Sequence, residues 1–242
     1  MMARRKRRTS SEAPQSIVES ELENPFFYIK NHRLTEKQKS LAEIAVDPNT
    51  KIVFINGPAG SSKTYMAIYA ALRLLAQDKE LELLYIRTII ESAERNMGAL
   101  PGNADEKFNP YMLPLEDKLE EFLKPSDHQR LFQEKRIEAM PINYLRGANW
   151  RNKLVVADEA QNFTFKELTT LITRIGEGTR LFVCGDFMQA DINGKTGYRA
   201  MCDRFNDGES KKMGIHAFKF GIEDIKRSKI LKFIIKRLQE TN

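Results

Sequence analysis

The sequence IVFINGPAGSSKT at residues 52–64 joins a short apolar segment to a turn of small residues. Residues 52–55 form a continuous apolar run, which is typical of a strand that is buried on both faces of a sheet. Residues 63–76 read KTYMAIYAALRLLA and predict a helix that is apolar almost all round and therefore buried. We therefore expect a buried strand, a tight turn and a buried helix in succession.

Apolar segments farther along the chain continue this alternation of strands and helices. We predict further strands at 83–86, 153–157, 180–184 and 217–220, and further helices at 35–46, 115–123, 166–175 and 228–238. Such alternation indicates an α/β fold in which helices cover both faces of a mostly parallel sheet. Ligands of these sheets bind beyond the carboxyl ends of the strands, so the functional residues should follow Ile55, Ile86, Ala157 and Cys184.

The turn after the first strand follows the Walker A pattern G-x-x-x-x-G-K-[ST] at every defined position except one. Small residues allow successive backbone N–H groups to close around a phosphate at the N-terminus of the next helix. Lys63 would then reach the terminal phosphates, and the Thr64 hydroxyl would hold Mg²⁺. The residues assigned to nucleotide binding here are Gly57, Pro58, Ala59, Gly60, Ser61, Ser62, Lys63, Thr64 and Tyr65.

Ser62 is the exception, because it stands where the pattern has its last glycine. Serine is small, and its N–H points toward the phosphate provided that its backbone φ stays negative, which we expect here. We therefore predict a working loop, whereas tight binding of the nucleotide stays an open question.

A pair of acids, Asp158-Glu159, directly follows the apolar segment at 153–157. Asp158 is placed to help hold Mg²⁺, and Glu159 is placed to orient and deprotonate an attacking water. The alternative is an acid pair at the N-terminus of a helix, where negative charge is favourable. Because a phosphate loop precedes this pair in the chain, we favour the catalytic interpretation.

A third polar group, Gly185-Asp186-Phe187-Met188-Gln189, follows the strand predicted at 180–184. A carboxylate and the amide of Gln189 at this strand end could sense the γ-phosphate of ATP through the attacking water. Taken alone, the segment is an ordinary turn between a strand and a loop. It gains weight as a third strand end directed at one place.

The order of GPAGSSKT, LVVADEAQN and GDFMQ resembles the RecA-like core of superfamily 1 helicases. Residues 86–123 (IRTIIESAERNMGALPGNADEKFNPYMLPLEDKLEEFL) and 144–186 (YLRGANWRNKLVVADEAQNFTFKELTTLITRIGEGTRLFVCGD) resemble the PhoH family more closely. This family implies a single-domain nucleotide-binding ATPase that is linked to phosphate starvation and is often found in phages. The resemblance runs from about Leu34 to Leu238.

The resemblance also implies roles for residues outside the three motifs. Gln38 matches a glutamine that reads adenine, although a surface glutamine on a helix is the alternative. Arg227 matches a late arginine that acts as an arginine finger, with a plain phosphate-facing role as the alternative. The implied catalytic set is therefore Lys63, Glu159, Gln189 and Arg227.

Three more arginines match the family, and two positions depart from it. Arg87, Arg146 and Arg174 are at family positions, where a structural ion pair is at least as plausible as catalysis. The departures are Ser62 and the pair Ile89-Ile90, where relatives usually carry prolines.

The positive charge of the chain is concentrated at its two ends. The 242 residues include 39 Lys and Arg against 33 Asp and Glu, a net charge of +6. Five of the positive charges lie between Arg4 and Arg8, and the segment from Asp203 to the end carries a net +4. Basic ends attract phosphate backbones by releasing counterions, although solubilising ends are the alternative. We predict a flexible basic arm at 1–24 and one ATPase domain at 25–242.

Composition narrows the cellular setting. No apolar run reaches the roughly 20 residues that a membrane helix needs, and no apolar segment follows the basic cluster as in a secretory signal. The two cysteines, Cys184 and Cys202, form no C-x-x-C pair and indicate free thiols. We therefore expect a cytoplasmic protein without a membrane partner.

One set of motifs leaves no room for a second RecA-like domain, so an arginine finger would have to come from a neighbouring subunit. The first hypothesis is an Mg²⁺-dependent ATPase that forms a ring, a hexamer as the family implies, and acts on RNA or another single-stranded nucleic acid. The second is a P-loop kinase of small molecules, against which the acid pair counts because activated water would waste ATP. The third is a nucleotide-dependent binding or assembly module with weak hydrolysis.

Overall fold

The computed structural model describes residues 25–88, 104–145, 149–189, 196–226 and 228–239, with only the backbone described at 104–111 and 239. The predictions made for the basic arm at 1–24, Ile89-Ile90, Arg146 and Arg227 lie outside these residues. None of the described helices is long and apolar enough to cross a lipid bilayer.

Six parallel strands form the centre of the molecule, in the order β3-β2-β4-β5-β1-β6. The strands are β1 (Ile52–Asn56), β2 (Glu82–Arg87), β3 (Ile137–Pro141), β4 (Lys153–Ala157), β5 (Arg180–Gly185) and β6 (Ile215–Lys219). β5 lies between β1 and β4, and the register pairs Ile55 with Cys184 and Ala157 with Val183. The residues that follow these three strands therefore emerge side by side, and the predicted α/β RecA-like fold is confirmed.

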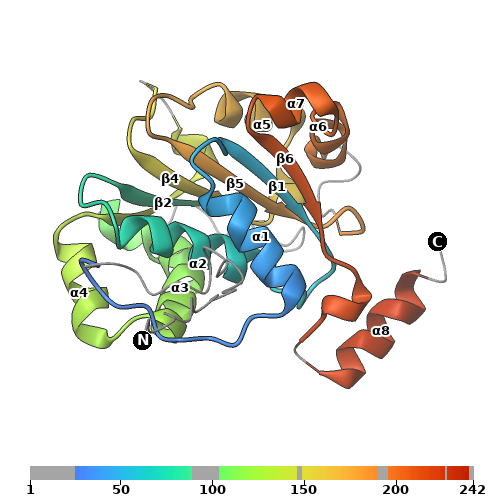
Figure 1. Ribbon diagram of the computed structural model, residues 1–242, viewed down its shortest axis with the longest axis horizontal. Helices are drawn as coiled ribbons and strands as arrows, with labels where there is room; N and C mark the ends of the chain where they lie inside the picture. The colour runs from blue at the N-terminus through green and yellow to red at the C-terminus, as the bar shows by residue number, and fades with distance from the viewer. Residues whose placement is uncertain (1–24, 89–103, 146–148, 190–195, 227, 240–242) are drawn as a thin grey trace, which may run out of the picture.

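Helices cover both faces of the sheet (Figure 1). They are α1 (Glu36–Val46), α2 (Lys63–Leu75), α3 (Ala104–Phe122), α4 (Pro125–Gln133), α5 (Phe165–Ile172), α6 (Tyr198–Arg204), α7 (Gly208–Lys212) and α8 (Lys229–Gln239), with short 3₁₀ turns η1 (Ile142–Tyr144), η2 (Ala160–Asn162) and η3 (Ile222–Asp224). One apolar cluster packs α1, α2 and α3 on one face, and a second packs α5 and α6 on the other.

Local sequence signals explain where several of these helices begin. Thr35 caps α1 in a capping box with Gln38, and Thr164 caps α5 in the same way with Glu167. The interior of α2 is fully buried, and each large apolar side chain that it removes from water contributes about 1.5–3 kcal/mol. This burial fixes α2 against the sheet and thereby fixes the loop that precedes it.

The C-terminal helix α8 is attached differently. It lies apart from the main body of the fold (Figure 1) and contacts η3. The helix carries an apolar stripe that faces outward: Ile230 is 63%, Ile234 45% and Leu238 64% exposed, and the neighbouring Phe233 is 55% exposed. Ile235, at 7%, is the buried exception.

Several elements differ from the predictions. The helix predicted at 115–123 is the end of the longer α3, which runs through Pro110 and Pro114 and is anchored by buried Leu115 and Leu119. The short elements α4, β3, α6 and α7 were not predicted. β3 ends in Pro141, which an edge strand tolerates because one side of its backbone pairs with no other strand.

Candidate nucleotide-binding site

The phosphate loop spans the turn between β1 and α2. A Cβ atom on Gly57 would lie 2.7 Å from Ser61 Oγ and 2.8 Å from Phe220 Cβ, so only glycine fits there. Gly60 adopts a left-handed backbone with φ of +77°. Both glycines are therefore needed for the tight path of the loop.

The backbone of Ser62 contradicts the expectation of a negative φ. Its φ is +70°, in the left-handed region that favours glycine. Serine adopts this conformation at a cost of about 1–2 kcal/mol. The Ser62 side chain makes no capping hydrogen bond to α2, so the first N–H groups of the helix keep no side-chain acceptor at this position.

Two polar groups of the loop fit a bound phosphate. The Oγ atom of Ser61 is buried and has no hydrogen-bond partner among the described residues. The ammonium group of Lys63 donates to the carbonyl oxygens of Gly57 at 2.6 Å and Pro58 at 3.0 Å, so its charge lies over the loop. Together with the free N–H groups of α2, these donors form an anion site at a helix N-terminus.

Asp158 lies opposite the loop, at the end of β4, and is only 7% exposed. Its two carboxylate oxygens accept hydrogen bonds from Thr64 Oγ1 at 2.5 Å and from the Tyr85 hydroxyl at 2.6 Å. Burial, followed by the charge of Asp158, raises the pKa of Tyr85 well above its usual value, so this hydroxyl stays a donor at neutral pH. One hydroxyl and one carboxylate at this spacing fit Mg²⁺, which takes few protein ligands besides the phosphates of its nucleotide.

Glu159 has a strained backbone and a well-supported side chain. Its φ of +53° is uncommon for a residue other than glycine, and such conformations concentrate at functional sites. The carboxylate accepts a hydrogen bond from the Gln161 amide and lies 4.0 Å from the guanidinium of Arg87. Glu159 precedes η2 but makes no capping hydrogen bond with its side chain, which argues against the alternative role as a helix-capping acid.

Gln161, which donates to Glu159, also links this acid to the end of β5. The Gln161 Oε1 atom accepts a hydrogen bond from the backbone N–H of Asp186 at 3.1 Å. Asp186 is buried and accepts the backbone N–H of Met188 at 2.9 Å. Gln189, three residues after Asp186, is exposed and lines the same cavity.

A cavity of about 770 Å³ unites these groups, a volume that suits a nucleotide. Ten of the residues that the sequence assigns to the site line it: Gln38, Ala59, Gly60, Ser62, Lys63, Thr64, Tyr65, Asp158, Glu159 and Gln189. The other three residues of the loop, Gly57, Pro58 and Ser61, do not line the cavity but make contacts within the loop. The structure therefore brings the predicted motifs to one place.

The far end of the cavity combines Gln38 with an aromatic wall. Gln38 is buried, which rules out the surface alternative, and its Oε1 accepts the Thr35 N–H at 2.9 Å. The ring of Tyr65 packs 4.5 Å from that of Phe122. Burial and the nearby charge of Glu121 raise the pKa of Tyr65 to about 12, so its hydroxyl also remains protonated.

Comparison with known proteins agrees with this geometry. Residues 30–239 match the family described as PhoH-like protein. The chain belongs to the PhoH-like family. It is 35% identical over 193 residues to the PhoH-like protein of Mycobacterium tuberculosis H37Rv, which covers 79% of this chain and 53% of the relative.

Other PhoH relatives show the same partial overlap. The PhoH-like protein of Synechocystis is 37% identical over 141 residues, with 58% of this chain and 43% of the relative covered. Protein PhoH of Escherichia coli K12 is 30% identical over 202 residues, with 81% and 55% covered. The chain thus spans about half the length of the curated relatives that it matches. The family and the fold support nucleotide binding.

Not every arginine that matches the PhoH family lies in the site. Arg87 faces Glu159, as described above, and lines the cavity. Arg174 donates to the backbone oxygen of Leu145 at 2.7 Å and is not among the residues that line the cavity, which fits the structural alternative.

Some residues of the site were missed by sequence reasoning. Tyr85 and Gln161 lie inside an apolar strand and a motif, where nothing marked their side chains as supports of the two acids. His32, Arg33, Leu34 and Lys226 also line the cavity, from irregular segments with no motif. No local pattern could have placed these last residues beside the loop.

Proposed function

We propose that this PhoH-like protein binds ATP with Mg²⁺ and hydrolyses it. The observation that carries the proposal is the convergence of the phosphate loop, Asp158 and Glu159 on one cavity. Three hydrogen bonds, from Thr64, Tyr85 and Gln161, hold the two acids in different environments. Both acids line the cavity, but Asp158 is buried beside Thr64 whereas the Glu159 side chain is 40% exposed, which suits a metal ligand and a general base respectively.

Each residue of the proposed site has a separate role in hydrolysis. Lys63 and the N–H groups of α2 bind the phosphates, and Thr64 and Asp158 would hold Mg²⁺, which neutralises phosphate charge when bound. A water oxygen attacks the γ-phosphorus, and Glu159 accepts a proton from that water. The bond from the γ-phosphorus to the bridging oxygen breaks, which leaves ADP and inorganic phosphate. Gln189 is placed to orient the water.

The support given to Glu159 favours hydrolysis over the kinase alternative. Gln161 fixes one carboxylate oxygen and Arg87 lies near the other, so the group is oriented before any water arrives. A kinase needs to keep water unreactive at this position. A binding module with weak hydrolysis remains the second candidate, because the left-handed Ser62 strains the loop.

We also propose that the protein assembles into a ring, a hexamer, in which Arg227 completes the site of a neighbouring copy. The exposed apolar stripe of α8 starts three residues after Arg227 in the sequence and needs a cover. Residues 229–239 contain four basic and no acidic residues, and the part of α3 that lines the cavity carries two acids, Asp117 and Glu121, against one base, Lys118. This charge complementarity supports a second copy of the chain as the occupant.

RNA or another single-stranded nucleic acid is the partner that we propose for the ring, in the cytoplasm. The support is the basic sequence at residues 4–8 and beyond Asp203, because such charge attracts phosphate backbones. ATP hydrolysis would then be coupled to binding or movement along the strand.

The decisive measurement is phosphate release, with ATP binding followed separately by calorimetry. We expect Glu159→Gln to bind ATP like the wild type but to hydrolyse it roughly 10²–10⁴-fold more slowly, because the amide holds water without accepting its proton. Glu177→Gln, at an exposed position outside the cavity, is the matched control and should behave as the wild type. Adding RNA or single-stranded DNA to the same assay should raise the rate. Hydrolysis at the wild-type rate by Glu159→Gln would place the base elsewhere.

A further inference from the structure

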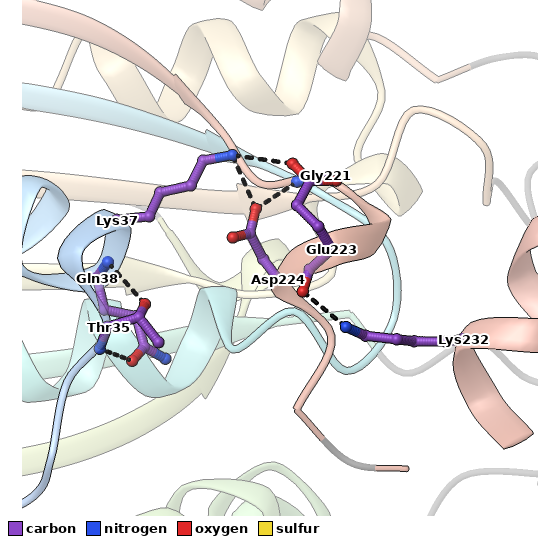
Figure 2. Close-up of polar contacts among 7 residues, drawn as sticks. All are labelled: Thr35, Lys37, Gln38, Gly221, Glu223, Asp224 and Lys232. Atoms are coloured by element: carbon purple, nitrogen blue, oxygen red, sulfur yellow. Dashed lines mark hydrogen bonds and ion pairs between the residues drawn. The ribbon is translucent and has the colours of Figure 1, made fainter. Parts of the chain in front are cut away.

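The turn after β6 is fixed to helix α1 by an ion pair between residues far apart in the sequence (Figure 2). Lys37 Nζ lies 2.8 Å from Asp224 Oδ2 and 3.4 Å from Glu223 Oε1. The Lys37 ammonium also lies 6.0 Å from the centre of the Phe220 ring. Lys37 is in the first turn of α1, next to Gln38.

The Asp224 carboxylate is held in place by a hydrogen bond within its own turn, independently of Lys37. Asp224 Oδ2 accepts the backbone N–H of Gly221 at 2.7 Å, and Asp224 is the less exposed partner, at 14% against 37% for Lys37. A carboxylate that is fixed in this way loses little conformational freedom when the ion pair forms. Lys37–Asp224 is therefore better placed to hold two segments together than a pair of flexible surface side chains.

The same turn also contacts the phosphate loop. The backbone N–H of Lys226 donates to the Gly60 oxygen at 3.2 Å, and Phe220 is buried against Gly57. Residues 220–226 therefore run from the back of the loop to its open side.

The turn contacts α8 as well. Lys232 Nζ donates to the Glu223 backbone oxygen at 2.8 Å, from the second turn of α8 (Figure 2). One short segment therefore joins three parts of the molecule: α1 with Gln38, the phosphate loop, and α8 with the exposed stripe.

We infer that Lys37 and Asp224 are positioning residues, which hold segment 220–226 across the phosphate loop and so align Gln38, the loop and the start of α8. The inference rests on the proposed function, since it concerns the efficiency of the same site. Neither residue touches the proposed reacting atoms. Both act through segment 220–226, in which the Lys226 N–H contacts Gly60 and the Glu223 backbone oxygen contacts α8.

Breaking the pair should slow hydrolysis more than it weakens ATP binding. The loop keeps its own donors in Lys37→Met and Asp224→Asn, so the dissociation constant for ATP should change less than about threefold. The hydrolysis rate should fall roughly 10-fold, because displacements of about 1 Å in a positioned group cost up to 10²-fold. The double variant should be no slower than the slower single variant, since both changes remove one interaction. Lys37→Arg should restore most of the rate.

Hydrogen exchange distinguishes a positioning role from general stabilisation, because loss of a positioning contact raises the exchange rate locally. In Lys37→Met and Asp224→Asn, amides of 220–239 should exchange faster than in the wild type, with β1 and β4 unchanged. Lys39→Met, on the same helix, is the matched control, because the described ion pair of Lys39 is made at 3.3 Å with Glu36 within α1. It should leave both rate and exchange as in the wild type.

The hydrolysis rate and the hydrogen exchange together distinguish failure of this inference from failure of the proposed function. If the wild type shows no ATP hydrolysis, the proposed function is wrong, and exchange of 220–239 still decides whether Lys37–Asp224 holds the turn. If exchange and rate are both unchanged in Lys37→Met, or if the two single effects add in the double variant, the inference is overturned. A lowered melting temperature with an unchanged rate would likewise assign the pair to stability alone.

Discussion

Two regions that meet at the phosphate loop are built in different ways: the strand ends that carry the phosphate site, called the phosphate end below, and the segment that follows β6, called the β6 end. At the phosphate end, β1, β5 and β4 are adjacent buried strands, and hydrogen bonds accepted by the side chains of Asp158 and Gln161 tie the segments beyond them together. At the β6 end, β6 is an edge strand, and the segment beyond it is held by two buried side chains, Phe220 and Ile225, by the Lys37 ion pair, and by backbone bonds from Phe220 and Lys226. The first region is fixed between paired strands, and the second is attached at the edge of the sheet.

This difference matches what each region has to do. Groups that bind phosphate and activate water need placement within about 0.5 Å, which buried strands and their supporting hydrogen bonds provide. A segment that leads into an exposed helix has to meet a neighbouring copy, so a peripheral attachment suits it. The comparison predicts that damage at the two ends will differ in kind: chemistry within one subunit at the first, communication between subunits at the second.

The strongest test of this division uses Arg227 and Glu159 together. Arg227→Ala should lower hydrolysis roughly 10³–10⁵-fold while ATP still binds, because an arginine finger stabilises charge that develops only in the transition state. Glu159→Gln is inactive for a different reason, in its own subunit. Mixed rings pair an intact Glu159 with an intact Arg227 from the next copy, so phosphate release should reappear on mixing.

Co-assembly has to be shown in the same experiment, for example by differently tagged subunits that purify together. Mixed rings that stay inactive would contradict a site shared between subunits. Full activity of a protein that is monomeric at the assay concentration would contradict it as well.

A smaller effect, on assembly, is expected from a substitution in the exposed apolar stripe of α8. Phe233→Asp places a charge in the stripe, and loss of a central aromatic anchor raises the concentration needed for assembly by roughly 30-fold. Sedimentation or light scattering over a dilution series measures this shift. Met213→Asp is the control, since Met213 is exposed to 70% on α7's C-terminal side and outside the stripe. Equal assembly of both variants would remove α8 from the interface.

The same contrast explains which parts of the structure could be predicted from the sequence. β4 was predicted at its observed bounds, and β1 to within one residue, because a strand buried on both faces leaves a continuous apolar run. The phosphate loop and the two acids were found because their chemistry requires fixed residue types at fixed spacing.

The parts of the structure that could not be predicted depend mostly on contacts between segments that are distant in the sequence. Lys37 and Asp224 are 187 positions apart, and nothing near either residue indicates the other. Tyr85 looks like any core residue until Asp158 is placed beside it. β3 and α4 are short and carry charged residues, so their periodicity is too weak to identify them. The only sequence signal for the left-handed φ of Ser62 is the glycine that the Walker A pattern has at this position, since serine itself gives no sign of it.

Ser62 supplies the mildest test of the rigid phosphate end. Ser62→Gly removes a left-handed strain of about 1–2 kcal/mol and adds about 0.5–1 kcal/mol of backbone entropy in the unfolded chain, so the net gain is up to about 1.5 kcal/mol. For a domain of this size, each 1 kcal/mol of gain raises the melting temperature by roughly 2–4 °C. ATP affinity should stay within about twofold of the wild type, because serine already holds the backbone that glycine would adopt. Ser62→Ala keeps the strain and loses a hydroxyl that makes no capping bond, so its melting temperature should match the wild type. A lower melting temperature in Ser62→Gly would mean that the serine side chain stabilises the loop through a contact worth more than the strain, and the phosphate end would then be less self-sufficient than its hydrogen bonds indicate.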